Sequence, residues 1–294
     1  MNKLLAANFI RLKKSKLFYL ILAFTILSTC LSLINNYETN RQLEAWHAGM
    51  EDSAFVPTTA MHLLYNMTPV LGLLAAFMIA MFIGTEYHDN TMRNKLICGQ
   101  SRSRVYLANL LTCVFITMLF YLIPVLMTLV IGIPLLGMPH VTSASLLQLL
   151  VFGVIGLLIS VVYASIFTLA AMLLHNRSYA LISCTILAMT LLIFGTFCNS
   201  RLEEPEYYSS YELGLTEDGT QTVLPTEPVK NPLYLDDSAR QVVTFLYDFL
   251  PGGQTIQIAD LHVTRPYLLM LYSIGIVAIS TAAGFCFFSK KDLR

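Results

Sequence analysis

The sequence predicts an all-α integral membrane protein with six membrane-spanning helices and both termini in the cytoplasm. Three observations lead to this prediction. Only 12% of the 294 residues are charged and 56% are apolar, whereas about a quarter of residues are charged in ordinary soluble domains. Six apolar stretches are each long enough to cross a bilayer and contain no Asp, Glu, Lys or Arg. The Lys and Arg residues are concentrated in alternate connecting segments.

The composition also excludes several classes of function. A mean hydropathy of +0.65 is not compatible with a soluble enzyme. The 18 Lys and Arg residues are balanced by 18 Asp and Glu residues, which argues against nucleic acid as a partner because nucleic-acid-binding proteins carry a basic excess. The Cys and His residues show no metal-site spacing, so we expect no metal and no cofactor in this chain.

The six predicted spans are residues 17–34, 66–83, 106–136, 146–174, 179–198 and 267–288. The third and fourth approach 30 residues and should tilt or protrude. Pro124 and Pro134 could break the third span. Thr, Ser and Tyr side chains within the spans could line a substrate path or only pack the helices together: Thr117, Tyr121, Ser160, Tyr163, Ser165 and Tyr272.

The orientation follows from the loops. With the N-terminus in the cytoplasm, 13 Lys and Arg residues lie in inner segments and 5 in outer segments. The acidic residues reverse this pattern, with 3 inside and 15 outside. The positive-inside rule therefore places both termini in the cytoplasm of a multi-pass protein.

Residues 1–16 precede the membrane domain, which runs over 17–198 and carries the first five spans. At 100° per residue, Leu5, Phe9 and Leu12 share one helical face and the cations cluster nearly opposite. This pattern predicts an amphipathic helix on the inner membrane surface. A simple positively charged anchor is the compatible alternative.

The loop between the second and third spans is the most informative segment. Asp89 or Asn90 can cap a short helix, Gly99 suits its left-handed end, and Ser101 or Ser103 can cap the next helix. The sequence therefore predicts a helix of about nine residues, roughly 13 Å long, presented to the cytoplasm. A solvated basic loop is the alternative.

This loop resembles a known family. Glu86, Asn90-Thr91-Met92-Arg93-Asn94-Lys95-Leu96, Gly99-Gln100-Ser101-Arg102 and Tyr106 are similar to a stretch of the permeases of type-2 ABC exporters, including the bacitracin-resistance and lantibiotic-immunity groups. Asn231-Pro232-Leu233-Tyr234, Leu250-Pro251-Gly252-Gly253-Gln254 and Phe287-Phe288-Ser289-Lys290-Lys291-Asp292-Leu293 resemble later segments of the same family.

The resemblance implies a six-span permease with the type-2 ABC exporter fold, located in a bacterial cell membrane. It implies that segment 86–104 contains a coupling helix, which contacts a cytoplasmic ABC ATPase subunit that binds ATP and Mg. The chain itself lacks the GxxxxGK[ST] phosphate-binding loop, so we do not expect it to be an enzyme. The expected contacts are Glu86, Arg93, Asn94, Lys95, Arg102 and Arg104. Glu86 could instead pair locally with Arg93 or Arg104.

The outer segment, residues 199–264, is acidic over much of its length. Residues 199–238 predict loop or short hairpins, and 239–250 predict an amphipathic helix that ends at Pro251-Gly252-Gly253. In the family this region dips back into the membrane, and 239–262 could do the same. Residues 265–294 form the last span and a cytoplasmic tail.

The leading hypothesis is export of a peptide antibiotic, a drug or a similar amphipathic substrate, driven by ATP hydrolysis in the partner subunit. We expect a second permease copy, or a related permease, because six spans rarely enclose a gated path. A secondary transporter or channel and a non-transporting sensor subunit are the alternatives. An intramembrane protease would need paired Glu and Arg or His side chains inside the bilayer. It is disfavoured because no Glu or Arg lies within a predicted span.

Overall fold

The computed structural model describes residues 1–47, 57–138, 143–174, 176–215 and 221–290. Within these ranges, six helical stretches are long and apolar enough to cross a membrane, which agrees with the predicted number. They are Lys16–His47, Ala60–His88, Arg102–Leu136, Ser145–Leu173, Arg177–Glu203 and Pro266–Lys290. The observed helices extend beyond most of the predicted spans because their polar end turns continue the helix.

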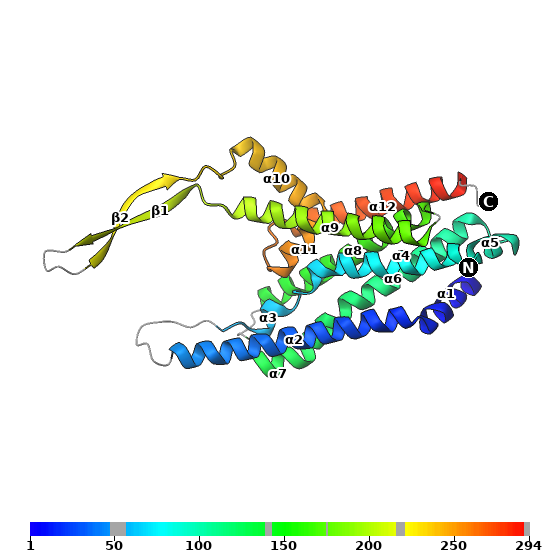
Figure 1. Cartoon of the computed structure of the whole chain (residues 1–294), viewed down its shortest axis with the longest axis horizontal. Helices are drawn as coiled ribbons and strands as arrows, with labels where there is room; N and C mark the ends of the chain where they lie inside the picture. Colours follow the sequence, from blue (N-terminus) through cyan, green and yellow to red (C-terminus); the bar gives the residue numbers. More distant parts are fainter. Residues whose placement is uncertain (48–56, 139–142, 175, 216–220, 291–294) are drawn as a thin grey trace.

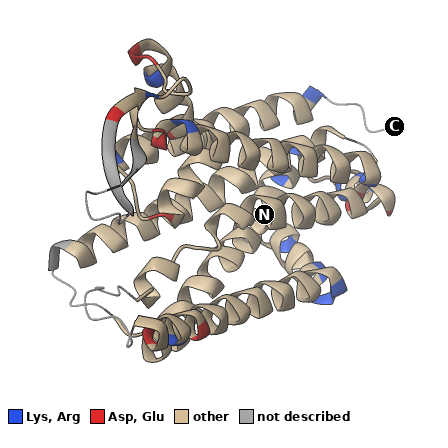
Figure 2. Ribbon diagram, turned by 60° about the vertical axis from the view of Figure 1, so that its left-hand side comes forward, with Lys and Arg blue, Asp and Glu red and all other residues tan. Residues whose placement is uncertain are grey.

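The two ends of the helix bundle differ (Figure 1). The N-terminus, α1, α5 and the end of α12 at Lys290 lie at one end, which we call the terminal end, and the β1–β2 hairpin extends from the opposite end. Charged residues gather toward the ends of the long helices and leave the middle of the bundle apolar (Figure 2). The helices are α1 (Asn2–Lys14), α2 (Lys16–His47), α3 (Ala60–Leu63), α4 (Thr68–His88), α5 (Thr91–Ile97), α6 (Arg102–Met127), η1 (Thr128–Gly132), α7 (Ile133–Leu136), α8 (Ser143–Leu173), α9 (Arg177–Glu203), α10 (Asp237–Phe249), α11 (Pro251–Ala259) and α12 (Pro266–Lys290).

The third span continues through both of its prolines. Pro124 lies inside α6, and a π-helical turn, η1, follows four residues later. Pro134 lies two residues after η1, inside a helical stretch that runs without a break from Arg102 to Leu136, so its missing N–H removes a donor for the preceding turn. The helix widens into η1 just before Pro134 instead of breaking, which is a common response to a lost intrahelical hydrogen bond.

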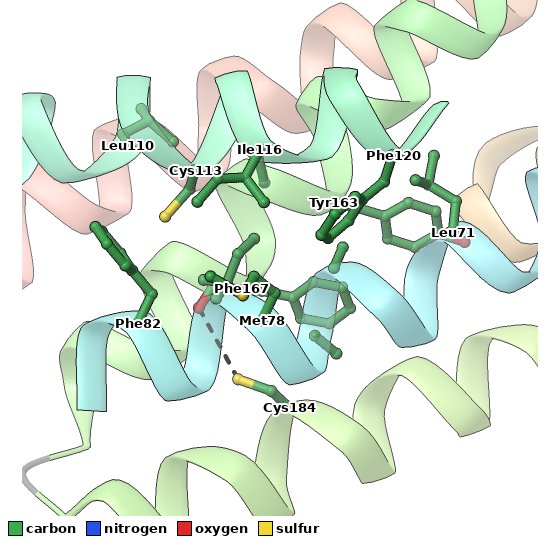
Figure 3. Close-up of a cluster of buried hydrophobic side chains, with 14 of the residues drawn as sticks. Leu71, Met78, Phe82, Leu110, Cys113, Ile116, Phe120, Tyr163, Phe167 and Cys184 are labelled. Carbon is green, nitrogen blue, oxygen red and sulfur yellow. Dashed lines mark hydrogen bonds between the residues drawn. The ribbon is translucent and has the colours of Figure 1, made fainter. Parts of the chain in front are cut away.

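The core lies between α4, α6, α8 and α9. Figure 3 shows Leu71, Met78 and Phe82 of α4 meeting aromatic and aliphatic side chains of α6 and α8, with the Cys184 thiol of α9 donating to the Phe167 carbonyl at 3.9 Å. In the most apolar part of each span, 61% of α3–α4 and 56% of α8 is buried, against 22% of α9 and of α12. Helices α4 and α8 are therefore central, while α9 and α12 expose most of their surface to the surroundings.

Buried hydroxyl groups join the central spans. The Thr117 hydroxyl of α6 donates to the Ser160 carbonyl of α8 at 2.9 Å, and the Ser280 hydroxyl of α12 donates to Ser165 Oγ of α8 at 2.8 Å. All four side chains are buried. Of the two roles that the sequence left open for these residues, the structure favours helix packing.

The outer segment contains more regular structure than the sequence predicts. Strands β1 (Tyr207–Leu215) and β2 (Gln221–Lys230) pair as an antiparallel hairpin. Helix α10 begins two residues before the predicted start because the Asp236 carboxylate accepts the Ala239 N–H at 3.3 Å and caps the helix. The Pro251-Gly252-Gly253 run ends α10 as predicted, but it also begins a further helix, α11.

Helix α11 enters the bundle and contacts α4, α8, α9 and α10. Residues 251–258 are all buried, and their polar side chains are paired. The Gln254 amide donates to the Asp248 carbonyl at 2.8 Å, and the Ser273 hydroxyl donates to Gln254 Oε1 at 2.9 Å. A re-entrant segment must have its polar groups hydrogen-bonded within the protein. The side chains of α11 named here meet this requirement.

Glycine allows α11 to approach α9 closely. A Cβ atom on Gly252 would lie 1.8 Å from the Leu191 carbonyl oxygen, and a Cβ on Gly195 would lie 2.5 Å from the Gly252 carbonyl carbon. Both clashes involve backbone atoms, which cannot rotate away. Contact between the two helices therefore depends on the absence of side chains at these positions.

We expect Gly252→Ala to lower the free energy of unfolding by about 3 kcal/mol or more, the upper end for overpacked sites. Thermal unfolding of the purified chain measures this. Gly275→Ala on α12 is the matched control, because a Cβ there meets no atom within 4 Å. Equal melting temperatures for the two variants would contradict the described packing of α11.

Candidate functional site

The loop between α4 and α6 folds into a short helix held between two left-handed residues. Helix α5 has seven residues, two fewer than predicted. Asn90 precedes it with φ 54°, and Gly99 follows it with φ 81°. Neither Asn90 nor Ser101 caps a helix through its side chain. The turn is therefore set by backbone conformation, with Gly99 in the left-handed role that the sequence predicts.

Glu86, in the last turn of α4, is the centre of a buried polar cluster. Its side chain is 0% exposed and forms ion pairs with Arg11 of α1 and Lys95 of α5. The Asn109 amide of α6 donates to Glu86 Oε2 at 2.8 Å. One carboxylate therefore contacts three other helices.

Asn8 extends this cluster along α1. Its amide donates to Asn109 Oδ1 at 2.7 Å and to Thr112 Oγ1 at 3.3 Å, and it accepts from Lys95 Nζ at 2.9 Å. Asn8, Asn109 and Thr112 are buried. We call Asn8, Arg11, Glu86, Lys95, Asn109 and Thr112 the Glu86 cluster.

Arg11 also holds α1 against α4. Its guanidinium donates to the Phe82 carbonyl at 3.2 Å and lies 3.7 Å from the centroid of the Phe82 ring. These contacts add a directional hydrogen bond and a cation–π interaction to the ion pair with Glu86. Arg11 therefore attaches α1 to α4 through an ion pair, a hydrogen bond and a cation–π contact.

The Glu86 cluster contains two cations and one carboxylate, so its charge balance depends on that carboxylate. Burial lowers the pKa of Lys95 below its usual 10.5, and the neighbouring Glu86 carboxylate acts in the opposite direction. Because two cations share one carboxylate, removal of the carboxylate would leave like charges buried beside each other. The Glu86 carboxylate is therefore the one group of the cluster that contacts α1, α5 and α6 from α4.

The six residues predicted to contact an ATPase fall into three groups. Arg93, Asn94 and Arg104 are exposed around α5 at the terminal end. Arg102 is half-buried and donates to the Ser289 carbonyl of α12 at 3.3 Å. Glu86 and Lys95 lie inside the Glu86 cluster. Glu86 thus has the local pairing that the sequence left open, but its partners are Arg11 and Lys95 and not Arg93 or Arg104.

Sequence reasoning missed the partners of Glu86 on α1 and α6. The predicted apolar face of α1 is present, because Leu12 is buried and Leu5 and Phe9 pack partly against the core. Asn8 lies on this face, four residues before Leu12, and a polar residue at such a position signals a buried partner. Asn109 within an apolar span gives the same signal.

The arrangement joins an exposed charged surface to a buried polar network. Exposed cations around α5 form a surface that another protein can contact. The buried side of α5 is joined through Lys95 and Glu86 to α4, and through Asn109 and Asn8 to α6 and α1. Lys95 of α5 is thus connected to three other helices through these contacts.

The comparison with known families agrees with this membrane architecture. The profile of the ABC-2 family transporter protein matches residues 4–199. This range includes the whole Glu86 cluster, the first four spans and the fifth span except its last four residues. Comparison with curated proteins finds no match for the chain. The narrower likeness to bacitracin-resistance and lantibiotic-immunity permeases stays a prediction. Because the matched range covers well over half of the sequence and the structure has six candidate spans, the chain belongs to the ABC-2 transporter family as a multi-pass membrane permease.

Proposed function

We propose that the chain is the permease subunit of an ATP-driven exporter, in which a separate cytoplasmic ATPase binds ATP and Mg. The observation that carries the proposal is the Glu86 cluster, which joins the exposed helix α5 to α1, α4 and α6. A surface helix with such an internal connection is suited to receive force from a partner. The expected cargo is a peptide antibiotic, a drug or a similar amphipathic molecule.

The need for an external energy source supports this proposal. The sequence contains no phosphate-binding loop of its own. The middle of each span also lacks Asp, Glu, Lys and Arg, so the usual groups of a proton or sodium relay are missing there. Glu86 is buried but lies at the end of α4, where it is paired with two cations and joined to α5. An ATPase that docks on α5 supplies the missing energy.

The proposed mechanism transmits motion through the Glu86 cluster. Closure of the ATPase would displace α5, and the ion pair between Lys95 and Glu86 would carry this displacement to α4. The hydrogen bonds from Asn109 to Glu86 and from Asn8 to Asn109 would carry it to α6 and α1. Coordinated tilting of these helices would then change which end of the substrate path is open.

We further propose that the working unit contains two permease chains, either two copies of this chain or this chain and a related permease. An apolar cavity between α3, η1, α7 and α8 has a volume of about 190 Å³, which is smaller than pockets for drug-sized ligands. The buried hydroxyls between α6, α8 and α12 are used for helix packing. A path for a large amphipathic cargo is therefore better formed between two chains.

Transport by purified components tests the proposal. The chain is reconstituted into proteoliposomes with its ATPase subunit, and flux of a cationic peptide antibiotic is measured with ATP on the ATPase side. We expect flux that requires ATP and is lost when the phosphate-binding lysine of the ATPase is replaced. Flux driven by a proton gradient without ATP would identify a secondary transporter or channel. ATP hydrolysis that responds to the peptide without flux would identify a sensor.

A further inference from the structure

A basic cavity is lined by Arg11, a residue of the Glu86 cluster that pairs with the Glu86 carboxylate. It has a volume of about 360 Å³ and is formed at the bend between α1 and α2, by α4 and by the first residue of α9. Four cations line it: Arg11, Lys14, Lys16 and Arg177. None of the described side chains in its lining is a carboxylate.

The bend between α1 and α2 places Lys14 and Lys16 together. Helix α1 ends at Lys14, and Ser15 adopts an extended conformation with ψ 110°. The Ser15 hydroxyl accepts the Phe18 N–H at 3.3 Å and so caps the beginning of α2. The chain therefore turns sharply at one residue, with a lysine on each side of the turn.

Close packing of α4 against α9 brings Arg177 to the same cavity. A Cβ atom on Gly84 would lie 2.9 Å from Arg177 Cα, so the two helices meet at this point. The Asn176 side chain accepts the Ser178 N–H at 2.8 Å and caps α9. The positive end of the 27-residue helix α9 therefore lies beside the cavity and adds to the attraction for an anion.

Three of the four cations have no anionic partner among the residues described. Arg11 is paired with Glu86, but no described carboxylate lies within ion-pair distance of Lys14, Lys16 or Arg177. Arg177 donates only to a thioether in the cavity wall, with 3.3 Å between its Nε and Met81 Sδ. These three cations are exposed, and an anion that enters the cavity would reduce their mutual repulsion and accept charge-assisted hydrogen bonds from them.

The other walls of the cavity are apolar. Leu17, Met78 and Phe82 line it together with Met81. A cavity with cations on one side and apolar side chains on the other, at the ends of three candidate spans, is complementary to a phosphate that carries acyl chains. Free phosphate would use the cations but not the apolar walls.

We propose that this cavity binds the phosphate headgroup of an anionic phospholipid, with Lys14, Lys16 and Arg177 as the principal contacts. Such a lipid would join the α1–α2 bend to the beginning of α9, next to the Arg11 side chain that reaches Glu86. Lipid binding requires that the chain is inserted into a membrane, but it does not require the proposed coupling to an ATPase. The lipid proposal and the ATPase proposal can therefore fail independently.

Lipid binding to the purified full-length chain tests the inference. Native mass spectrometry in a neutral detergent measures binding of phosphatidylglycerol, of phosphatidylcholine and of inorganic phosphate. We expect phosphatidylglycerol to bind at least tenfold more tightly than phosphatidylcholine. Lys14→Gln, Lys16→Gln and Arg177→Gln should each weaken phosphatidylglycerol binding roughly fivefold, and by on the order of 100-fold in combination.

Lys13→Gln is the matched control, because Lys13 is exposed on the same helix, carries the same charge and does not line the cavity. It should leave phosphatidylglycerol binding unchanged. Equal affinity for the two lipids, or full binding by the triple variant, would overturn the inference. Competition by inorganic phosphate at millimolar concentration would overturn the lipid assignment and indicate a free-phosphate site. If the triple variant does not fold, the three single variants provide the same test.

Discussion

Replacing Glu86 with glutamine should lower the free energy of unfolding by about 3–5 kcal/mol, the range for removing one partner of a buried ion pair. The substitution keeps the size of the side chain but leaves Arg11 and Lys95, whose side chains are 27% and 15% exposed, as partly buried cations without a shared anion. We therefore expect both a lower melting temperature and loss of ATP-driven transport. Thermal unfolding and flux through proteoliposomes measure the two effects on the same preparation.

Asp89→Asn is the control for Glu86→Gln. Asp89 lies three residues further along the chain, and its side chain is 52% exposed and paired with the exposed His88. Its removal should change stability by less than about 0.5 kcal/mol, as for most surface charges. In Glu86→Gln, replacing Lys95 with methionine should restore part of the lost stability because one buried cation is removed. A Glu86→Gln protein as stable as the wild type would show that the cluster does not hold the helices together.

Reversing the charge of Arg93 should leave the stability of the chain unchanged but weaken its binding to the ATPase subunit. Arg93 is exposed on α5 and makes no described ion pair, so Arg93→Glu should leave the melting temperature unchanged. In the proposed complex it should weaken binding of the ATPase subunit on the order of 10- to 100-fold. Titration of the ATPase subunit onto immobilised permease in a bilayer nanodisc measures this affinity.

Lys13→Glu provides the comparison for Arg93→Glu. It reverses an exposed charge at the same end of the molecule, but on α1 and outside the predicted contacts. We expect ATPase binding to remain within about twofold of wild type, since a distant surface charge acts mainly through screened long-range attraction. Equal loss of affinity in both variants would mean that net charge, and not the α5 surface, determines binding.

The spans could be predicted because they depend on local composition. A bilayer requires about 20 apolar residues for each crossing, and charged residues collect in the connections. Gly99 could likewise be placed because a left-handed helix end favours glycine at one defined position. In each case, the physical cause is contained within a short stretch of sequence.

The Glu86 cluster could not be predicted in the same way because its contacts join distant parts of the chain. Asn8 and Asn109 are separated by 101 residues, and Lys95 and Asn8 by 87. Periodicity identifies a face but not the helix that packs on it. The role of Gly252 was also hidden, because glycine usually weakens a helix and here allows α11 to contact the backbone of α9.

The most direct test of the central claim is cross-linking from the end of α5. Cys98 is an exposed free thiol at this position, and Cys286 is an exposed free thiol on α12. A photoactivatable maleimide is attached to Cys98 in a Cys286→Ser chain, or to Cys286 in a Cys98→Ser chain, and each is illuminated with the ATPase subunit. If α5 is the docking helix, a covalent adduct with the ATPase forms from Cys98 and not from Cys286. No adduct from Cys98, or equal adducts from both positions, would contradict docking on α5.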